Sequence, residues 1–114
     1  DRLQQIFDTT PDVIRLVNAA GEVILCNRAA LEFFGAASLE ELRQRSFQAS
    51  YPQWAGTQTL EVGIPAALFK GSWRGETVLI NAQGLEIKAS QVILALPDSD
   101  GSSYLFTLIC RSLT

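Results

Sequence analysis

Apolar residues along this chain follow strand-like spacing at both ends and helix-like spacing between them. Near the N-terminus, two β-rich runs over Asp12–Asn18 and Val23–Cys26 flank the tight connection 19–22, which predicts a hairpin. Three later stretches, rich in Val, Ile, Leu, Thr and aromatic residues and joined by turn residues, predict an antiparallel meander: Trp73–Asn81, Leu85–Leu96 and Ser103–Arg111. Separate blocks of strands and helices favour an α+β fold over alternating βαβ units.

The segment after the hairpin carries the start and stop residues of short helices. Asn27 is a suitable N-cap for a helix over Arg28–Phe34, and Gly35 allows a left-handed stop. The sequence Ser-Leu-Glu-Glu from Ser38 to Glu41 predicts a capping box at the start of a second helix. In that box, Ser38 would accept from the Glu41 amide, and the Glu41 side chain would reach back to the amide of Ser38.

A third helical region is predicted in two pieces. Thr57–Val62 has helical character until Gly63 and Pro65 interrupt it. Pro65 then stands near the first position of a further short helix over Ala66–Lys70, and Gly71 follows its end.

Composition and charge limit the classes of partner. With 114 residues, 47% of them hydrophobic and 18% charged, the chain is expected to fold as one domain. The net charge of −3 is scattered, without a basic run that could follow a phosphate backbone, which argues against nucleic acid. Apolar stretches are far shorter than the ~20 residues that span a bilayer, so no membrane contact is expected. We interpret the chain as a cytoplasmic fragment of a larger protein, because it starts abruptly and shows no signal sequence.

The residue types needed for catalysis or metal binding are largely missing. Histidine is absent, which removes the usual general base and the commonest ligand of zinc, copper and haem. Cys26 and Cys110 lie in strand-like apolar runs, where thiols act as small hydrophobes. Glu40 and Glu41 are adjacent on a predicted helix and point in different directions. We therefore predict no catalytic residue, no metal site and no enzyme activity in this chain.

Several local motifs, in this order, resemble the PAS domain family. Phe7–Asp12 (FDTTPD), Val17–Gly21 (VNAAG) and Cys26–Ala30 (CNRAA) look like the family's opening strands and helix-starting Asn. Gly71–Glu76 (GSWRGE) resembles its entry into the third strand, and Asn81–Gly84 (NAQG) leads into the fourth. The resemblance spans nearly all of residues 1–114. It implies a single domain with a five-stranded antiparallel sheet in the order 2-1-5-4-3, and short helices packed on one face.

The resemblance also bears on cofactors and on the cysteines. Photosensory members carry a reactive cysteine in a G-x-N-C-R-F-L-Q motif, which this chain lacks, and haem-binding members use a histidine. Neither flavin nor haem is therefore expected, although an unknown small molecule remains possible. Cys26 and Cys110 would lie on strands separated by the first strand, so two free thiols are expected. Ser112 stands where many members have the Asp of an Asp-Ile-Thr coupling motif.

The resemblance places a ligand between the helices and the inner face of the sheet. Strand alternation puts Gln91 in an otherwise apolar inward row with Ile87, Ala89 and Ile93. A buried amide needs partners, which could be a ligand, water, other protein groups or a helix backbone. Large aromatic residues nearby, with Trp73 beside them, could line a pocket or pack as core. The candidate ligand-binding residues are Phe47, Tyr51, Trp54, Leu68, Phe69, Gln91 and Ile93.

Two functions remain open from sequence. The first is a sensory input module of a bacterial-type signalling protein, such as a sensor kinase or a cyclic-dinucleotide enzyme, that responds to a small molecule through ligand-biased packing. The alternative is a ligand-free interaction module that forms a homodimer through the open sheet face and a stripe of Leu3, Ile6 and Phe7 at helical spacing. Both functions would act through neighbouring domains of the parent protein.

Overall fold

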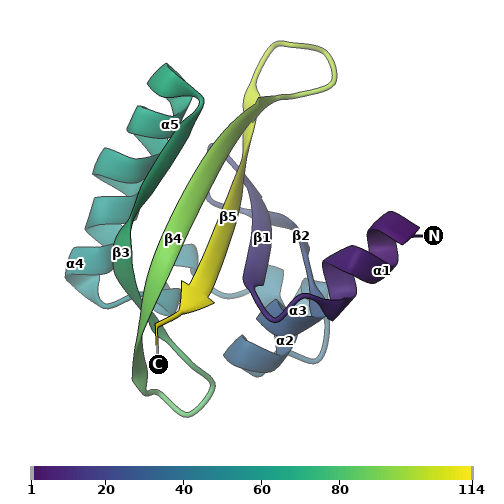
Figure 1. Ribbon diagram of the computed structural model, residues 1–114, viewed down its shortest axis with the longest axis vertical. Coiled ribbons are helices and arrows are strands. Elements are labelled where there is room, and N and C mark those ends of the chain that lie inside the picture. The colour runs from purple at the N-terminus through teal and green to yellow at the C-terminus, as the bar shows by residue number, and fades with distance from the viewer. Residues whose placement is uncertain (1, 114) are drawn as a thin grey trace.

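A computed structural model describes residues 2–113 as one twisted sheet with helices packed beside it (Figure 1). The strands are β1 (Val13–Asn18), β2 (Val23–Cys26), β3 (Ser72–Ile80), β4 (Glu86–Pro97) and β5 (Tyr104–Ser112). The helical elements are α1 (Arg2–Thr9), α2 (Arg28–Phe34), α3 (Leu39–Arg43), η1 (Phe47–Ser50), α4 (Gln53–Gln58), η2 (Thr59–Gly63) and α5 (Ile64–Lys70). All strand pairs are antiparallel in the order β2-β1-β5-β4-β3, which confirms the predicted fold class and strand order.

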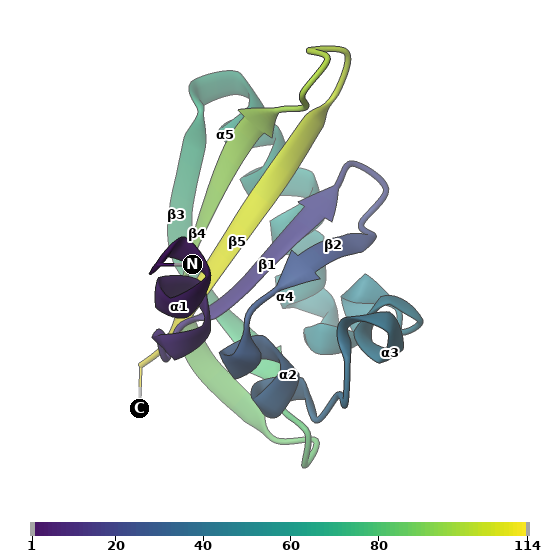
Figure 2. The same cartoon turned by 90° about the vertical axis from the view of Figure 1, so that its right-hand side faces the viewer.

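One face of the sheet carries the core. Figure 2 shows α4 and α5 behind the strands, with α1 on the opposite side of the sheet. Along β4, alternate residues Ala89, Gln91 and Ile93 are buried, as predicted from the period of two. Their neighbours Ser90, Val92 and Leu94 are only partly buried. The inward face of the sheet is therefore the wall against which any internal ligand would lie.

The cap of α2 fixes this helix to the sheet. The Asn27 Oδ1 atom accepts from the amides of Ala30 at 3.0 Å and Ile14 at 3.1 Å, and its Nδ2 donates to the carbonyl of Asp12 at 2.8 Å. One buried amide thus caps the helix and joins it to β1. Gly35 ends the helix with a φ of 66°, as predicted.

The capping box of α3 forms with one change. The Ser38 Oγ atom accepts from the Glu41 amide at 3.2 Å, as expected. The Glu41 carboxylate, however, accepts from the amide of Ala37 at 3.2 Å instead of that of Ser38. The prediction was wrong by one residue, because the extended backbone at Ser38 leaves the preceding amide within reach of the side chain.

The predicted break at Gly63 and Pro65 was wrong, because α4, η2 and α5 follow one another without a gap. η2 is a π-helical turn in which the Ile64 amide donates to the Thr59 carbonyl. We attribute the tolerance of Pro65 to this wider turn, since it relieves the clash between a proline ring and the preceding turn. Gly63 is helical, and a Cβ there would lie 2.7 Å from the Ile93 Cδ1 atom. Its role is therefore close approach to the sheet and not termination.

Both cysteines are free thiols, as predicted from their separation by β1. Cys110 is buried on β5, and Cys26 is half-buried at the end of β2. Across residues 2–113, no helix has the length and apolar character needed to cross a membrane. Within the same range, no cluster of three or more His, Cys, Asp or Glu side chains is arranged to hold a metal ion.

Candidate functional site

A pocket of about 240 Å³ lies between the inner face of the sheet and the segment from α2 to η1. Its apolar wall includes Phe34 from α2, Leu42 from α3 and Ile80 from β3. Its polar groups include Arg15 from β1 and Ser50 from η1. This combination of an apolar wall and a few oriented polar groups is typical of small-molecule sites.

Arg15 is the most unusual side chain of this pocket, because it is only 2% exposed. Its Nη1 donates to the Ser50 Oγ atom at 3.0 Å, and its Nη2 donates to the Tyr51 hydroxyl at 2.7 Å. The guanidinium carbon lies 5.0 to 5.3 Å from the ring centres of Phe34, Phe47 and Tyr51. These cation–π contacts hold a buried charge that has no carboxylate partner within residues 2–113.

Sequence reasoning missed Arg15, although the signal was present. Strand alternation puts Arg15 on the same face as Val13 and Val17, and both valines are buried. The alternation that places Gln91 inward on the fourth strand therefore also places Arg15 inward on the first. A charged residue between two inward apolar positions would have marked it as a candidate site residue.

Behind Arg15, a buried chain of polar side chains crosses the core. The Tyr51 hydroxyl donates to the Gln91 Oε1 atom at 2.7 Å, and the Gln91 Nε2 atom donates to the Thr59 Oγ1 at 3.0 Å. The Cys110 thiol also donates to the Gln91 Oε1 at 3.3 Å. Gln91 is therefore inward and fully buried, as predicted. The interpretation that it pairs with a helix backbone was wrong, because Thr59 stands between Gln91 and the carbonyl of Ala55.

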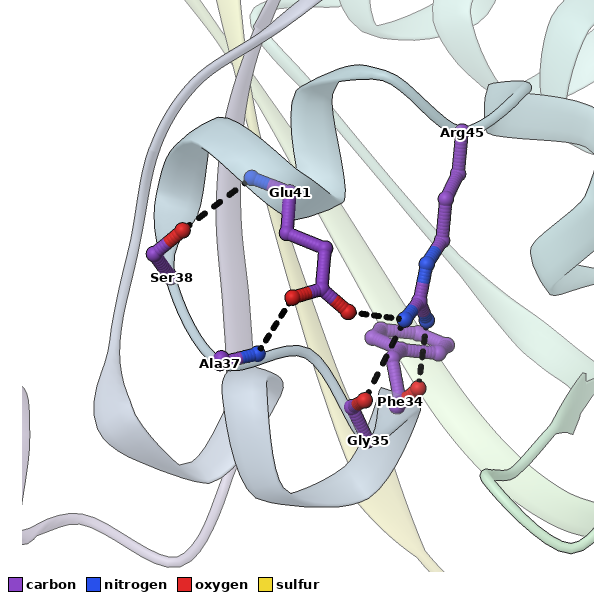
Figure 3. A network of polar contacts seen from close by, with 6 residues as sticks. All are labelled: Phe34, Gly35, Ala37, Ser38, Glu41 and Arg45. Atoms are coloured by element: carbon purple, nitrogen blue, oxygen red, sulfur yellow. Dashed lines mark hydrogen bonds and ion pairs between the residues drawn. The ribbon is translucent and has the colours of Figure 1, made fainter.

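Arg45 also lines the pocket, and its side chain joins the end of α2 to α3 (Figure 3). Arg45 donates to the carbonyl of Phe34 at 2.6 Å and to that of Gly35 at 3.2 Å. These bonds satisfy carbonyls at the end of α2 that have no partner within the helix. Arg45 also pairs with the carboxylate of Glu41 at 2.9 Å. Unlike Arg15, Arg45 therefore has an acidic partner.

The seven predicted ligand-binding residues fall into two groups. Phe47 lines the pocket, Tyr51 and Gln91 lie in the network behind it, and Ile93 is buried in the core. The other three are exposed on α4 and α5 and do not join this group: Trp54, Leu68 and Phe69. Phe69 is the most exposed of them, at 88%.

Trp54, Leu68 and Phe69 are exposed because the segment α4–α5 packs closely against the sheet. The buried face of this helical segment carries small residues four apart: Ala55, Thr59, Gly63 and Ala67. Small side chains allow the helix backbone to approach the sheet closely and leave no room on this face for aromatic side chains of the helices themselves. The large residues of these helices do not mark their buried face, whereas the spacing of the small ones identifies it.

The two thiols are expected to differ in reactivity. Burial raises the pKa of Cys110 to about 11, although nearby Arg15 acts in the opposite direction. Burial also raises the pKa of the half-buried Cys26. Because the thiolate is the reactive form, Cys110 should resist iodoacetamide at about pH 8, and its labelling should increase as pH rises. Mass spectrometry of the native protein should show Cys26 alkylated first, and both thiols alkylated after denaturation. Equal alkylation rates of Cys26 and Cys110 in the native protein would contradict the burial of Cys110.

Comparison with solved structures identifies the class of fold. The PAS domain from Colwellia psychrerythraea superposes with a TM-score of 0.83 at 20% identity, over 100% of this chain and 98% of that one. The PAS domain of a LuxR-family regulator from Burkholderia thailandensis, in complex with ethanol, gives 0.74 at 20% identity, over 96% of each chain. VqmA bound to DPO gives 0.76 at 15% identity, over 99% of this chain and 57% of that one. The structure thus has a PAS fold.

Sequence comparison gives the family. The profile of the PAS domain family matches residues 1–64, which is more than half of the chain. The chain therefore belongs to the PAS domain family. No curated protein sequence matches it.

Proposed function

We propose that this PAS domain is the sensory module of a signalling protein and that it responds to a small molecule in the pocket beside Arg15. The observation that carries the proposal is a pocket of about 240 Å³ directly against a buried, only partly satisfied guanidinium. Two PAS-fold proteins similar to this chain were solved in complex with small molecules, ethanol and DPO. The ligand of this chain need not resemble either one.

The buried polar network offers a route from the pocket to the sheet. Arg15 contacts Ser50 at the pocket and Tyr51 beside it, and Tyr51 is bonded to Gln91 on β4. Gln91 in turn accepts from Cys110 on β5. A ligand that repositions η1 would therefore change the hydrogen bonds of two central strands. Only a difference in its affinity for the two arrangements can shift their populations and so drive an output.

A second function, homodimerisation through α1, is favoured by one separate observation. Leu3 is 78% exposed and Ile6 is 65% exposed on a helix with no buried residue among 2–9. Phe7 is half-buried, and α1 packs against α2, so the predicted stripe is available mainly through Leu3 and Ile6. Exposed apolar side chains on one helix face are typical of contact surfaces between proteins. We also propose that the sensory module controls the output of the parent protein, which would be a kinase or a cyclic-dinucleotide enzyme.

Native mass spectrometry of the purified chain, with a denatured control, tests both functions. We expect a reproducible small-molecule adduct that disappears on denaturation and gives the mass of the ligand. Ala49→Phe, at an exposed position in the pocket wall, should weaken the adduct by crowding the pocket. Ala19→Phe, exposed in the β1–β2 turn, is the matched control and should retain it. A dimer without any adduct, and without thermal stabilisation by a metabolite panel, would refute sensing and support the interaction module.

A further inference from the structure

The hydrogen-bonding capacity of Arg15 is only partly used. A guanidinium has five N–H donors in a fixed planar arrangement. The structure gives acceptors to two of them, Ser50 and Tyr51. The Nε–H group is buried and has no partner. Leaving buried donors without acceptors is costly, so this side chain is prepared for an acceptor that the protein itself does not supply.

The charge of Arg15 is also only partly compensated. Within residues 2–113 no carboxylate forms an ion pair with it, and its neighbours include two hydroxyls, the neutral Cys110 thiol and three aromatic rings. Ring faces and hydroxyls stabilise a cation less than a carboxylate does, because neither carries a full negative charge. A buried charge is normally paired, since removal from water is expensive. The missing group is therefore an anion.

The rest of the pocket fits an anion with an apolar body. No Asp or Glu among the described residues lines it, and the second cation at its wall, Arg45, is already paired with Glu41. Phe34, Leu42 and Ile80 supply apolar surface. The volume of about 240 Å³ is below the range of drug-sized pockets. The site therefore suits a small molecule that carries one anionic group on an apolar body.

We propose that the ligand is a small organic carboxylate. Its carboxylate binds the free edge of Arg15, and its apolar body packs against Phe34, Leu42 and Ile80. The proposal rests on the sensory function proposed above and names the chemical class of the ligand. Arg15 would then have a dual role, since it recognises the anion and, through Tyr51 and Gln91, joins the site to β4 and β5.

Calorimetric titration of the whole chain at neutral pH tests the class of ligand directly. The probes are benzoate, phenylacetate and isovalerate, each compared with its amide: benzamide, phenylacetamide and isovaleramide. Acid and amide have nearly the same shape, so their difference reports the anionic charge. We expect at least one carboxylate to bind with an affinity about tenfold or more above that of its amide. This comparison uses the unmodified protein and requires no variant to fold.

Variants then locate the discrimination at Arg15. Arg15→Gln should abolish the preference for carboxylate over amide, and Arg15→Lys should retain part of it, because the charge remains but the planar donor pair is lost. Arg74→Gln makes the same change of net charge at an exposed position of β3 and should leave the preference intact. Circular dichroism on each variant verifies the fold.

Failure of this inference differs from failure of the sensory function. If the amides bind as tightly as the acids, the pocket binds ligands but the carboxylate assignment is wrong. If none of the six probes binds, the carboxylate assignment is also overturned. In either case, a co-purified adduct that is sensitive to Ala49→Phe would still uphold sensing, because that measurement does not depend on the chemical class of the ligand.

Discussion

Gln91→Leu is expected to lower the free energy of unfolding by about 3 kcal/mol, because it removes the residue that joins three other buried side chains. Leucine has a similar size but offers no polar atom. The Tyr51 hydroxyl and the Cys110 thiol would lose their common acceptor, and Thr59 would lose a donor. The largest part of the cost comes from the tyrosine hydroxyl, which stays buried and loses its acceptor.

Urea unfolding followed by circular dichroism measures this effect. The matched control is Gln83→Leu, the same substitution at an exposed position of the β3–β4 turn, which should change stability by less than about 0.5 kcal/mol. If Gln91→Leu were as mild as the control, the polar chain would contribute nothing net to folding. Its retention in the core would then have to be explained by function alone.

The general architecture could be predicted because its signals are local. Asn27 and Gly35 mark the ends of α2 by side-chain capping and by a positive φ, and both effects act within a few residues. The strand order came from the resemblance to PAS domains, since periodicity gives strands but not their neighbours. The π turn at η2 could not be predicted, because it depends on how closely Gly63 approaches Ile93 of the sheet.

The candidate site was predictable only where alternation places a polar side chain inward. Gln91 was found in this way, and Arg15 follows from the same rule on β1. The positions of Trp54 and Phe69 did not follow from their size, because a large aromatic residue can occupy either face of a helix. What places them outside is the tertiary distance between α4–α5 and the sheet, together with the small residues that allow it.

Gly35→Ala is expected to lower the free energy of unfolding by about 3 kcal/mol through two separable effects. The φ of 66° at this residue costs any side chain roughly 1 to 2 kcal/mol. In addition, the new Cβ would lie 2.7 Å from the Cβ of Ala82 in the β3–β4 turn. Neither atom can move independently of its backbone, and the Ala82 amide is bonded to the Phe33 carbonyl at 2.8 Å. The overlap therefore costs about another 1 to 2 kcal/mol.

Two further variants separate strain from overlap in the same urea measurement. Gly84→Ala, at a φ of 80° with nothing within 4 Å of a new Cβ, should show the conformational cost alone, about 1 kcal/mol. Ala82→Gly, combined with Gly35→Ala, should restore the part of the unfolding free energy that is lost to the overlap of the two Cβ atoms. The effects of the two substitutions on stability should therefore be strongly non-additive. Because Ala82 and Phe34 both line the pocket, the rescued protein should also regain any ligand binding lost with Gly35→Ala. Additive effects on the free energy of unfolding would mean that the end of α2 can shift away from the turn. This wall of the pocket would then be less rigid than its hydrogen bonds indicate.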